Sequence, residues 1–587
     1  MAEVPRAGGC AIDVVCAMIS AVTSPGSSLG PGVRGLSSPG ARLTAAGIAA
    51  VTLVYAILVW DHRWIADDGL IVVRTVREIL AGNGPVYSPF ERAEASTSTA
   101  WLWLLAGCGW IVGGNVARLA VGLGGLLSVA GLVVALDATR RFHRDRGHAG
   151  VLVPVGVLVV LAVFPFWDYA TSGLETGLGF FWLAAIWWLL VTLRPDSRDL
   201  RLIGFAVVVG LGPLVRPDFM LATTVFLIAG WQIARPPWRR ALGLCGAACC
   251  VPLAYEIFRA GYYGALVPLP ALAKSATASE WSRGVGYLIR FVKPHLLYVP
   301  LAVLAAAVVL ERRTIVGRST VVLAAPAIAA VLVAAFVVRV GGDFMHARLL
   351  LPSTLLIIAP TLLLPAGRVT TGAALALTAW ALVIGSRVFT RTRPVFQDER
   401  AGYLRYTGQP HPTSEADYID GRAAGVASNV RDALRDGRRF LLSEAGDRLA
   451  MNPALDAPVA IAMGHLGIGG MIAPVDGIVV DTFGLANPLG ARIVRTQPGK
   501  TGHEKSLPWA WVLADFADLA VATPDISRAT IDAARHAMSC GELAELLASV
   551  REPMTAARFW ANLTGALRRT RLVIPADPVE AEHQFCP

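Results

Sequence analysis

Charged residues are scarce in this chain, and lysine is scarcer still. Of the 587 residues, 16% are charged and 55% are hydrophobic, and the mean hydropathy is +0.56. This composition excludes an ordinary soluble protein and predicts a polytopic membrane protein. Among the 52 basic residues the only lysines are Lys274, Lys293, Lys500 and Lys505.

A nucleic-acid partner is also excluded, although the net charge of +10 could suggest one. The arginines occur in short clusters between apolar runs, as in residues 140–146. Membrane topology alone produces this pattern, because basic residues gather in cytoplasmic loops.

Cysteine spacing argues against a zinc site, because the eight cysteines form no C-x-x-C or Cys/His ligand pattern. Cys540 and Cys586 are the only two in the polar C-terminal part of the chain. If that part lies outside the cytoplasm, they are the natural disulfide pair. The others lie in the N-terminal tail or in apolar segments.

Residues 1–40 are rich in glycine, proline and serine, and we predict a disordered cytoplasmic tail without a cleaved signal peptide. The first apolar run, 43–60, follows Arg34 and Arg42. By the positive-inside rule the N-terminus is cytoplasmic, and the segment after this run is outside. Asp67 and Asp68 therefore emerge on the outer face.

Between this outer pair and the basic cytoplasmic loop 140–146 the chain must cross the membrane an odd number of times. Of the two apolar segments there, 97–112 is short and rich in tryptophan, so we place it in the interface. We predict about eleven spans in all. They are 43–60, 118–136, 151–166, 177–193, 202–215, 219–233, 242–258, 295–310, 320–338, 350–364 and 371–388.

Three segments follow from this reading: the tail 1–40, a membrane domain 41–390 with a first outer loop 61–117, and an extracytoplasmic α/β domain 391–587. In the last of these we predict a helix near 423–435 and strands at 440–443, 459–463 and 477–481. Residues 464–470 are glycine-rich, but they lack the dinucleotide fingerprint and indicate a turn at a helix start.

The adjacent carboxylates Asp67 and Asp68 are the strongest candidates for chemistry. Two close carboxylates cannot both ionise freely, so one pKa should rise towards the range of a general base. A divalent metal site and a solvated helix end are the two competing interpretations.

Other charged side chains are predicted at the outer ends of spans, where a carboxylate can stay ionised. Glu175, Asp218 and Asp343 would line a polar pocket. The same loops contain four candidate cations for binding a phosphate, namely Arg216, Lys274, His346 and Arg348. The alternative is that Arg216 and Arg348 merely pair with neighbouring aspartates.

The C-terminal part contains one dense group of functional side chains, in the Gly/Pro-bounded loop 501–508. His503 and Glu504 lie in this loop, and Trp509 follows it. We predict that they contact the same cleft, whereas a generic surface loop is the alternative.

The ordered set of motifs resembles the GT-C glycosyltransferases that use polyprenyl-phosphate sugars. More narrowly, it is similar to the actinobacterial arabinofuranosyltransferases that form terminal β-(1→2) linkages. The resemblance covers nearly all of the chain after residue 40. It rests on residues 66–70 (Ala-Asp-Asp-Gly-Leu), 172–176 (Ser-Gly-Leu-Glu-Thr), 216–218 (Arg-Pro-Asp), 341–352, 481–487 and 502–504.

The resemblance implies a GT-C membrane fold, a decaprenyl-phosphoryl-arabinofuranose donor and an arabinan acceptor of the cell wall, either arabinogalactan or lipoarabinomannan. Asp67 or Asp68 would be the base or would stabilise the oxocarbenium ion. The implied donor-phosphate contacts are Arg216, Lys274, Arg348 and His346, and the implied sugar and acceptor contacts are Glu175, Asp218, Asp343, His503, Glu504 and Trp509. No cofactor is required, and a divalent cation is left open.

Two alternatives remain at this point. One is a GT-C transferase of another specificity, such as an α-arabinofuranosyl- or mannosyltransferase. The other is a lipid-sugar transporter, which would predict internal repeats and charges near span midpoints. The charges here fall at the ends of the predicted spans, which favours a transferase.

Overall fold

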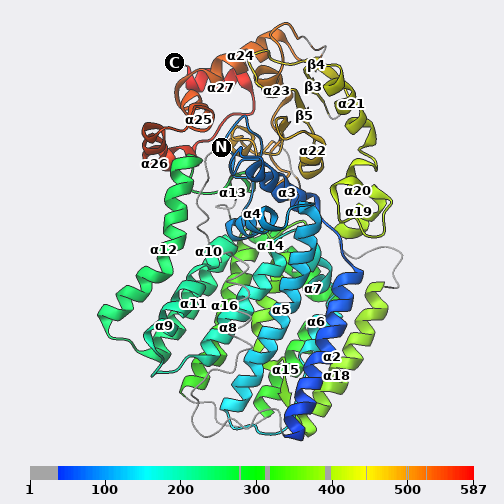
Figure 1. Cartoon of the computed structure of the whole chain (residues 1–587), viewed down its shortest axis with the longest axis vertical. Coiled ribbons are helices and arrows are strands. Elements are labelled where there is room, and N and C mark those ends of the chain that lie inside the picture. Colours follow the sequence, from blue (N-terminus) through cyan, green and yellow to red (C-terminus); the bar gives the residue numbers. More distant parts are fainter. Residues whose placement is uncertain are drawn as a thin grey trace.

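The computed structural model describes residues 38–275, 279–310, 317–389, 398–443, 446–496, 499, 501–521, 523 and 525–586. Residues 1–37 of the predicted tail lie outside this set. The molecule is elongated, with a bundle of long helices at one end and a smaller α/β region at the other (Figure 1). We call residues 38–389 the helix bundle and residues 398–586 the C-terminal region.

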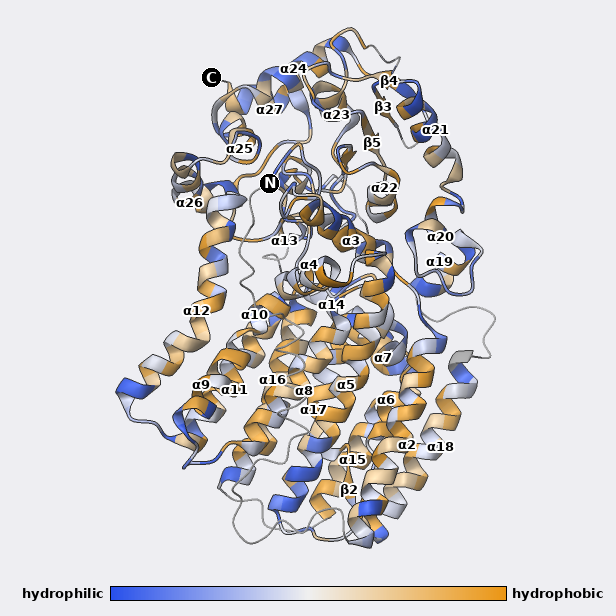
Figure 2. Cartoon of the chain, in the orientation of Figure 1, coloured by the Kyte–Doolittle hydropathy of each residue, from blue (hydrophilic) through white to orange (hydrophobic). Residues whose placement is uncertain are grey.

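Long apolar sequences form the helix bundle, and their outer surfaces are hydrophobic over most of their length (Figure 2). Its longer helices are α2 (Pro39–Asp61), α5 (Val116–Asp145), α8 (Thr176–Thr192), α9 (Asp199–Gly210), α11 (Met220–Ala234), α12 (Trp238–Tyr262), α14 (Trp281–His295), α15 (Tyr298–Leu310), α16 (Arg318–Arg339) and α18 (Arg368–Phe389). Among the described residues, six helices are long and apolar enough to cross a membrane. The protein is therefore a polytopic membrane protein.

Counting two sharply bent helix pairs as single spans raises that number to at most eight. The difference from eleven arises where an expected span is broken into short pieces. Residues 151–166 form β1 (Leu152–Val153), α6 (Val157–Ala162) and the start of α7 (Pro165–Asp168), and 202–215 is interrupted between α9 and α10 (Gly212–Val215). Residues 350–364 likewise form η3 (Arg348–Leu350), α17 (Leu351–Ile358), η4 (Ala359–Thr361) and β2 (Leu364–Pro365).

Small residues allow the two central helices α5 and α8 to pack closely. A Cβ atom at Gly177 would lie 2.2 Å from the carbonyl oxygen of Gly124. A Cβ atom at Gly131 would lie 2.9 Å from the backbone nitrogen of Phe181. Such close backbone approach is how apolar helices associate where water supplies no driving force.

Two shorter helices, α3 (Asp67–Leu80) and α4 (Thr99–Val112), lie side by side at the end of the bundle that faces the C-terminal region (Figure 1). The Ser98 side chain caps the first turn of α4. At about 1.5 Å per residue, this helix is too short to cross the roughly 30 Å hydrocarbon layer upright. Trp101 is buried whereas Trp110 is 81% exposed. The interfacial placement of this segment remains a prediction.

The C-terminal region contains a four-stranded sheet in the order β4-β3-β5-β6. Its strands are β3 (Phe440–Leu442), β4 (Arg448–Ala450), β5 (Val459–Ala462) and β6 (Ile478–Val480). The pairs β3–β5 and β5–β6 are parallel, and β3–β4 is antiparallel. The three predicted strands are thus present as β3, β5 and β6.

Helices surround this sheet. The predicted helix near 423–435 is α21 (Ala424–Arg435), and the glycine-rich stretch after β5 begins α22 (Leu466–Ile472). Cys540 and Cys586 form a disulfide that joins the start of α25 to the end of α27. The remaining helices are α19 (Glu399–Thr407), α20 (Glu415–Ile419), α23 (Trp509–Phe516), α24 (Arg528–Met538), α25 (Gly541–Arg551), α26 (Ala556–Arg571) and α27 (Pro578–Phe585).

The buried Arg74 of α3 connects the helix bundle to the C-terminal region. Its guanidinium pairs with Glu78 at 2.6 Å. It also donates hydrogen bonds to the carbonyl oxygens of Gly470 at 3.1 Å and Ala473 at 2.8 Å, next to α22. Because a buried guanidinium is costly unless its donors are satisfied, this contact holds α3 firmly against α22.

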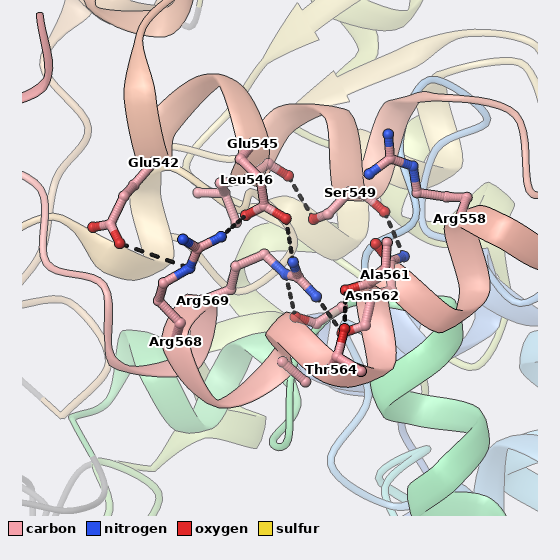
Figure 3. A network of polar contacts seen from close by, with 12 residues as sticks. Glu542, Glu545, Leu546, Ser549, Arg558, Ala561, Asn562, Thr564, Arg568 and Arg569 are labelled. Atoms are coloured by element: carbon pink, nitrogen blue, oxygen red, sulfur yellow. Dashed lines mark hydrogen bonds and ion pairs between the residues drawn. The ribbon is translucent and has the colours of Figure 1, made fainter.

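A second contact connects α26 to the end of α12. Figure 3 shows the polar network between α25 and α26 to which Asn562 and Arg569, the residues of this contact, belong. Arg569, which is buried, pairs with Glu545 of α25 and donates to the Gly264 carbonyl at 2.9 Å. Asn562 donates to the Gly261 carbonyl at 3.0 Å. These two contacts help to fix the C-terminal region to the bundle.

Candidate active site

A cleft of about 330 Å³ lies between the helix bundle and the C-terminal region. The bundle contributes the start of α3, the residue after α13 (Leu269–Ala273) and the loop after α16. The C-terminal region contributes α19, the start of α22 and two loops. The cleft is lined by Asp67, Asp68, Lys274, Phe344, Glu399, Tyr403, Gly464, His465, Leu466, Phe483, Leu485, Thr501, Gly502 and His503.

Asp67 is the first residue of α3 and is only 8% exposed. Its Oδ1 accepts a hydrogen bond from the backbone N–H of Ile468, at 2.8 Å, in the first turn of α22. The contact requires a glycine beside it, because a Cβ atom at Gly467 would lie 2.0 Å from the Asp67 carbonyl oxygen. The C-terminal region thus supplies a hydrogen bond that holds the Asp67 carboxylate at the start of α3.

The surroundings of Asp67 make it a poor acid. Burial, followed by the charge of Asp68, raises the pKa of Asp67 to about 7, although the hydrogen bonds from α22 oppose this. Among the described residues, no cation lies within ion-pair distance of it. A carboxyl group that titrates near neutral pH can accept a proton from a hydroxyl group, as a general base does.

Behind this pair, a second set of carboxylates is held by arginines. Arg348 binds Asp343 at 2.7 Å. Arg216 binds Glu175 at 2.6 Å and Asp218 at 3.0 Å. The two systems are coupled, because Arg348 also feels the charges of Glu175 and Asp68.

The arginine pairing reverses the effect of burial on Asp343. Burial would raise its pKa, but the charges of Arg348 and then Lys274 outweigh this effect and lower the pKa. Asp343 therefore stays ionised at neutral pH. Lys274 belongs to the cleft lining, so it links this charged layer to the open space where a ligand phosphate could lie.

The loop that carries Asp343 depends on its two glycines. Gly341 and Gly342 have φ angles of 91° and 74°, in the left-handed region that glycine enters without a penalty. A Cβ atom at Gly342 would lie 2.4 Å from the ring of Tyr287. The Tyr287 hydroxyl in turn donates to the Met345 carbonyl at 2.9 Å, which holds the loop in place.

His346 lies away from the cleft. Its ring stacks on Phe164 at 6.0 Å and on His295 at 5.4 Å, and only 6% of the residue is exposed. Burial, followed by the charge of His295, lowers the pKa of His346 to about 3. A neutral, enclosed imidazole cannot act as a cationic phosphate contact, so the structure does not support that predicted role.

The loop 501–508 contributes one of its predicted residues to the cleft. His503 lines it and packs between the rings of Phe344, at 5.5 Å, and Phe483, at 4.8 Å. Glu504 instead pairs with Arg283 of α14. Trp509 begins α23 and packs against the core of the C-terminal region.

Glu399 and Tyr403 are cleft residues that the sequence motifs did not single out. Both lie on α19, in the polar stretch after the last long helix. The Tyr403 ring stacks on Trp64 at 5.8 Å, just before the Asp67–Asp68 pair. His465 also lines the cleft, and the glycine-rich sequence around it does not indicate what its side chain faces.

The motif 481–487 has a structural explanation. The Asp481 carboxylate accepts hydrogen bonds from the backbone N–H groups of Phe483, at 2.8 Å, and Ala486, at 2.6 Å. Asn487 accepts from the N–H groups of Leu489 and Gly490, both at 2.9 Å. These contacts shape the loop that presents Phe483 to the cleft.

Three candidate metal ligands lie close enough together to share an ion among the described residues: His536, Cys540 and Cys586. Both cysteines of this group are joined in the disulfide. A divalent cation at Asp67 and Asp68 remains a prediction.

Together, the helix bundle and the carboxylate-lined cleft define a membrane protein whose polar site lies at one end of its apolar helices. The terminal β-(1→2)-arabinofuranosyltransferase of Mycobacterium tuberculosis is 35% identical to the chain, over 90% of this chain and 95% of that protein. The enzyme of the same name from Corynebacterium glutamicum is 32% identical, over 94% of this chain and 90% of that protein. The chain belongs to the family of terminal β-(1→2)-arabinofuranosyltransferases.

A second comparison agrees with this assignment. Residues 426–584 match the family model described as the AftB family C-terminal domain. No solved structure matches the chain.

Proposed function

We propose that this protein is a glycosyltransferase that adds arabinofuranose to the ends of cell-wall arabinan, in arabinogalactan or lipoarabinomannan, through terminal β-(1→2) linkages. Its family membership supports the reaction. The observation that carries the proposal at the site is Asp67, a buried carboxylate with a pKa of about 7 in the wall of a cleft. The proposed donor is decaprenyl-phosphoryl-arabinofuranose.

The chemical demand on the protein is twofold. The acceptor hydroxyl must lose a proton as it attacks, and the departing phosphate must be stabilised. We assign the first task to Asp67, or to Asp68 acting beside it. Lys274 is the cation that lines the cleft, and we assign it to the phosphate.

Arg216 and Arg348 belong to the group of ion pairs behind the cleft. Their ion pairs with Asp218, Glu175 and Asp343 place their guanidiniums next to the site. On donor binding, a phosphate oxygen would compete for the outward N–H groups of Arg348, which already feels the charge of Asp68.

The sugar rings would pack on the aromatic wall formed by Tyr403, Phe483 and His503. If donor and product are both β-linked, the reaction retains configuration. A single in-line displacement would invert it, so either a double displacement or a front-face route is required. Two carboxylates side by side provide the groups that either route needs.

For topology, we propose about eleven spans, with a cytoplasmic N-terminus and an extracytoplasmic cleft and C-terminal region. Arg435 at the end of α21 and Arg235 after α11 are exposed. In Figure 1, α21 belongs to the C-terminal region, whereas α11 and α12 are joined at the ends of these helices that point away from that region. In intact cells, a membrane-impermeant maleimide should label Arg435→Cys and spare Arg235→Cys. The opposite pattern would reject this orientation.

The decisive test is a membrane assay with radiolabelled polyprenyl-phosphoryl arabinose and a synthetic arabinan acceptor. Linkage analysis of the product should find new terminal β-(1→2) residues. Absence of transfer by the wild-type protein, or undiminished transfer by Asp67→Ala combined with Asp68→Ala, would reject the proposal.

A further inference from the structure

An apolar groove of about 310 Å³ lies between α9, α11 and α12. Figure 1 shows these three helices as neighbours at one side of the bundle. The groove is at the end of these helices that is remote from the catalytic cleft. The groove is closed in one direction, because a Cβ atom at Gly210 of α9 would lie 2.1 Å from the Ala248 carbonyl oxygen of α12. Its lining is Leu193, Leu202, Phe205, Ala206, Leu227, Ile228, Gly230, Trp231, Ala234, Pro236, Ala241, Leu244 and Cys245.

Arginines stand directly beside one edge of the groove. Arg194 follows the lining residue Leu193, and Arg201 precedes the lining residue Leu202. Arg194 binds Asp145 at 2.8 Å, and Arg318 shares that carboxylate at 3.4 Å. One carboxylate therefore serves two guanidiniums.

Arg201 is the least compensated member of this cluster. Among the described residues, no carboxylate lies within ion-pair distance of its guanidinium. Desolvation, followed by the charges of Arg194 and Arg141, lowers the pKa of Arg201. An anion bound between these like charges would stabilise them.

The opposite edge is basic as well. Arg235 and the lining residue Pro236 lie in the turn between α11 and α12, and Arg239 and Arg240 follow in the first turn of α12. Arg240 is exposed and approaches Asp199 at only 3.8 Å. In Figure 2 the ribbons of α9 and α12 change from hydrophobic to hydrophilic colours at this end.

Two features narrow the ligand to one chemical class. The groove runs between α11 and α12, which are both candidate membrane spans, so its occupant comes from the lipid phase. Its arginine-rich end requires a negative headgroup, for which guanidiniums offer paired hydrogen bonds. Basic pockets between membrane helices bind anionic lipid headgroups in this way.

We propose that this groove binds one anionic phospholipid, with an acyl chain against the apolar lining and the phosphate held by Arg194 and Arg201. A neutral lipid could fill the groove but would leave Arg201 without a counter-charge, and Arg194 would still share Asp145 with Arg318. The site is separate from the catalytic cleft, and its test reads binding rather than transfer. Its failure would therefore leave the proposed function untouched.

The first experiment is native mass spectrometry of the full-length protein after incubation with phosphatidylglycerol or phosphatidylcholine. We expect one tightly retained phosphatidylglycerol and about tenfold weaker retention of phosphatidylcholine. Arg194→Gln with Arg201→Gln should abolish that preference. Arg435→Gln with Arg438→Gln removes the same charge from the surface of the C-terminal region and should preserve it.

Equal retention of the two lipids by the wild-type protein would overturn the proposal. So would an undiminished preference after both substitutions. The melting temperature of the lipid-free variants distinguishes loss of the site from loss of the fold.

A second experiment needs no substitution. Cys245 lines the groove, whereas Cys250, also free and exposed on α12, does not. Phosphatidylglycerol should slow alkylation of Cys245, measured by peptide mass spectrometry, by about tenfold relative to phosphatidylcholine and leave Cys250 unchanged. Equal protection of both cysteines, or of neither, would contradict a lipid bound in the groove.

Discussion

Asp67 and Asp343 are both buried carboxylates at the same end of the helix bundle, with 8% and 6% of each residue exposed. Asp343 has Arg348 at 2.7 Å, so its pKa is lowered despite burial. Asp67 has the N–H of Ile468 and the neighbouring charge of Asp68, so its pKa rises to about 7. The neighbouring group, and not the degree of burial, therefore decides the direction of the pKa shift. Asp343 stays ionised, whereas Asp67 can exchange a proton near neutral pH.

The two carboxylates also differ in how far along the sequence their partners lie. Asp343 and Arg348 belong to one loop, so their pairing needs only the local geometry set by Gly341 and Gly342. Asp67 meets Ile468 across 401 residues of sequence. The carboxylate that we propose as the base is therefore the one whose environment requires both parts of the molecule.

The largest expected effect follows from replacing Asp67, the proposed base. Asp67→Asn should lower the turnover number by about 10²–10⁴-fold, because the amide cannot accept the proton. Its oxygen can still accept the Ile468 N–H, so the melting temperature should not fall. Turnover in reconstituted membranes checks this, and near-normal transfer would show that Asp67 is not the base.

Asp343→Asn should act mainly on stability. It leaves Arg348 buried without its countercharge, and loss of one partner of a buried pair costs roughly 3–5 kcal/mol of unfolding free energy. Thermal unfolding measures the loss. In the double variant with Arg348→Met the penalty should shrink, because the unpaired charge is gone, and equal losses in the single and double variants would contradict the pairing.

Gly467→Ala tests the contact between the two parts. The added methyl group would collide with the Asp67 carbonyl and push α22 away, at a cost of about 1–3 kcal/mol. Transfer should fall several-fold, and the pKa of Asp67 should rise further because its hydrogen bonds weaken. Gly425→Ala on α21 is the matched control, since a Cβ atom there meets no atom within 4 Å. Equal activity of the two variants would separate α22 from catalysis.

The smallest effect concerns pH. A base must be deprotonated, so transfer should rise as the pH rises through about 7, the pKa of Asp67. Asp68→Asn removes a charge that raises this pKa, so the acidic limb of its residual activity should move to lower pH by up to about one unit. A limb that stays in place would show that Asp68 does not influence the reacting group.

Stability supplies an independent readout of the same pKa. The folded-state pKa of Asp67 lies above the ordinary value of 3.8, so the folded protein holds this proton more tightly than the unfolded chain. The wild-type protein should therefore lose stability relative to Asp67→Asn as pH rises from about 4 to 7. Above that window the difference should be constant. Melting temperatures across this pH range test the prediction.

The sequence by itself determined the features that depend on near neighbours. Long apolar runs set the long helices, short apolar runs set the three predicted strands, and the isolation of Cys540 and Cys586 set the disulfide. The position of the charges at the ends of apolar runs also followed, because charge is expensive within hydrocarbon. These properties need no knowledge of what packs against what.

Only the tertiary structure decided which of those charges meet. It placed α22 on Asp67, brought Glu399 and Tyr403 of α19 into the cleft, and turned His346 into an aromatic stack away from it. It also broke several expected spans into short bent pieces. Contacts between segments hundreds of residues apart depend on the packing of whole helices, which no local pattern of residues encodes.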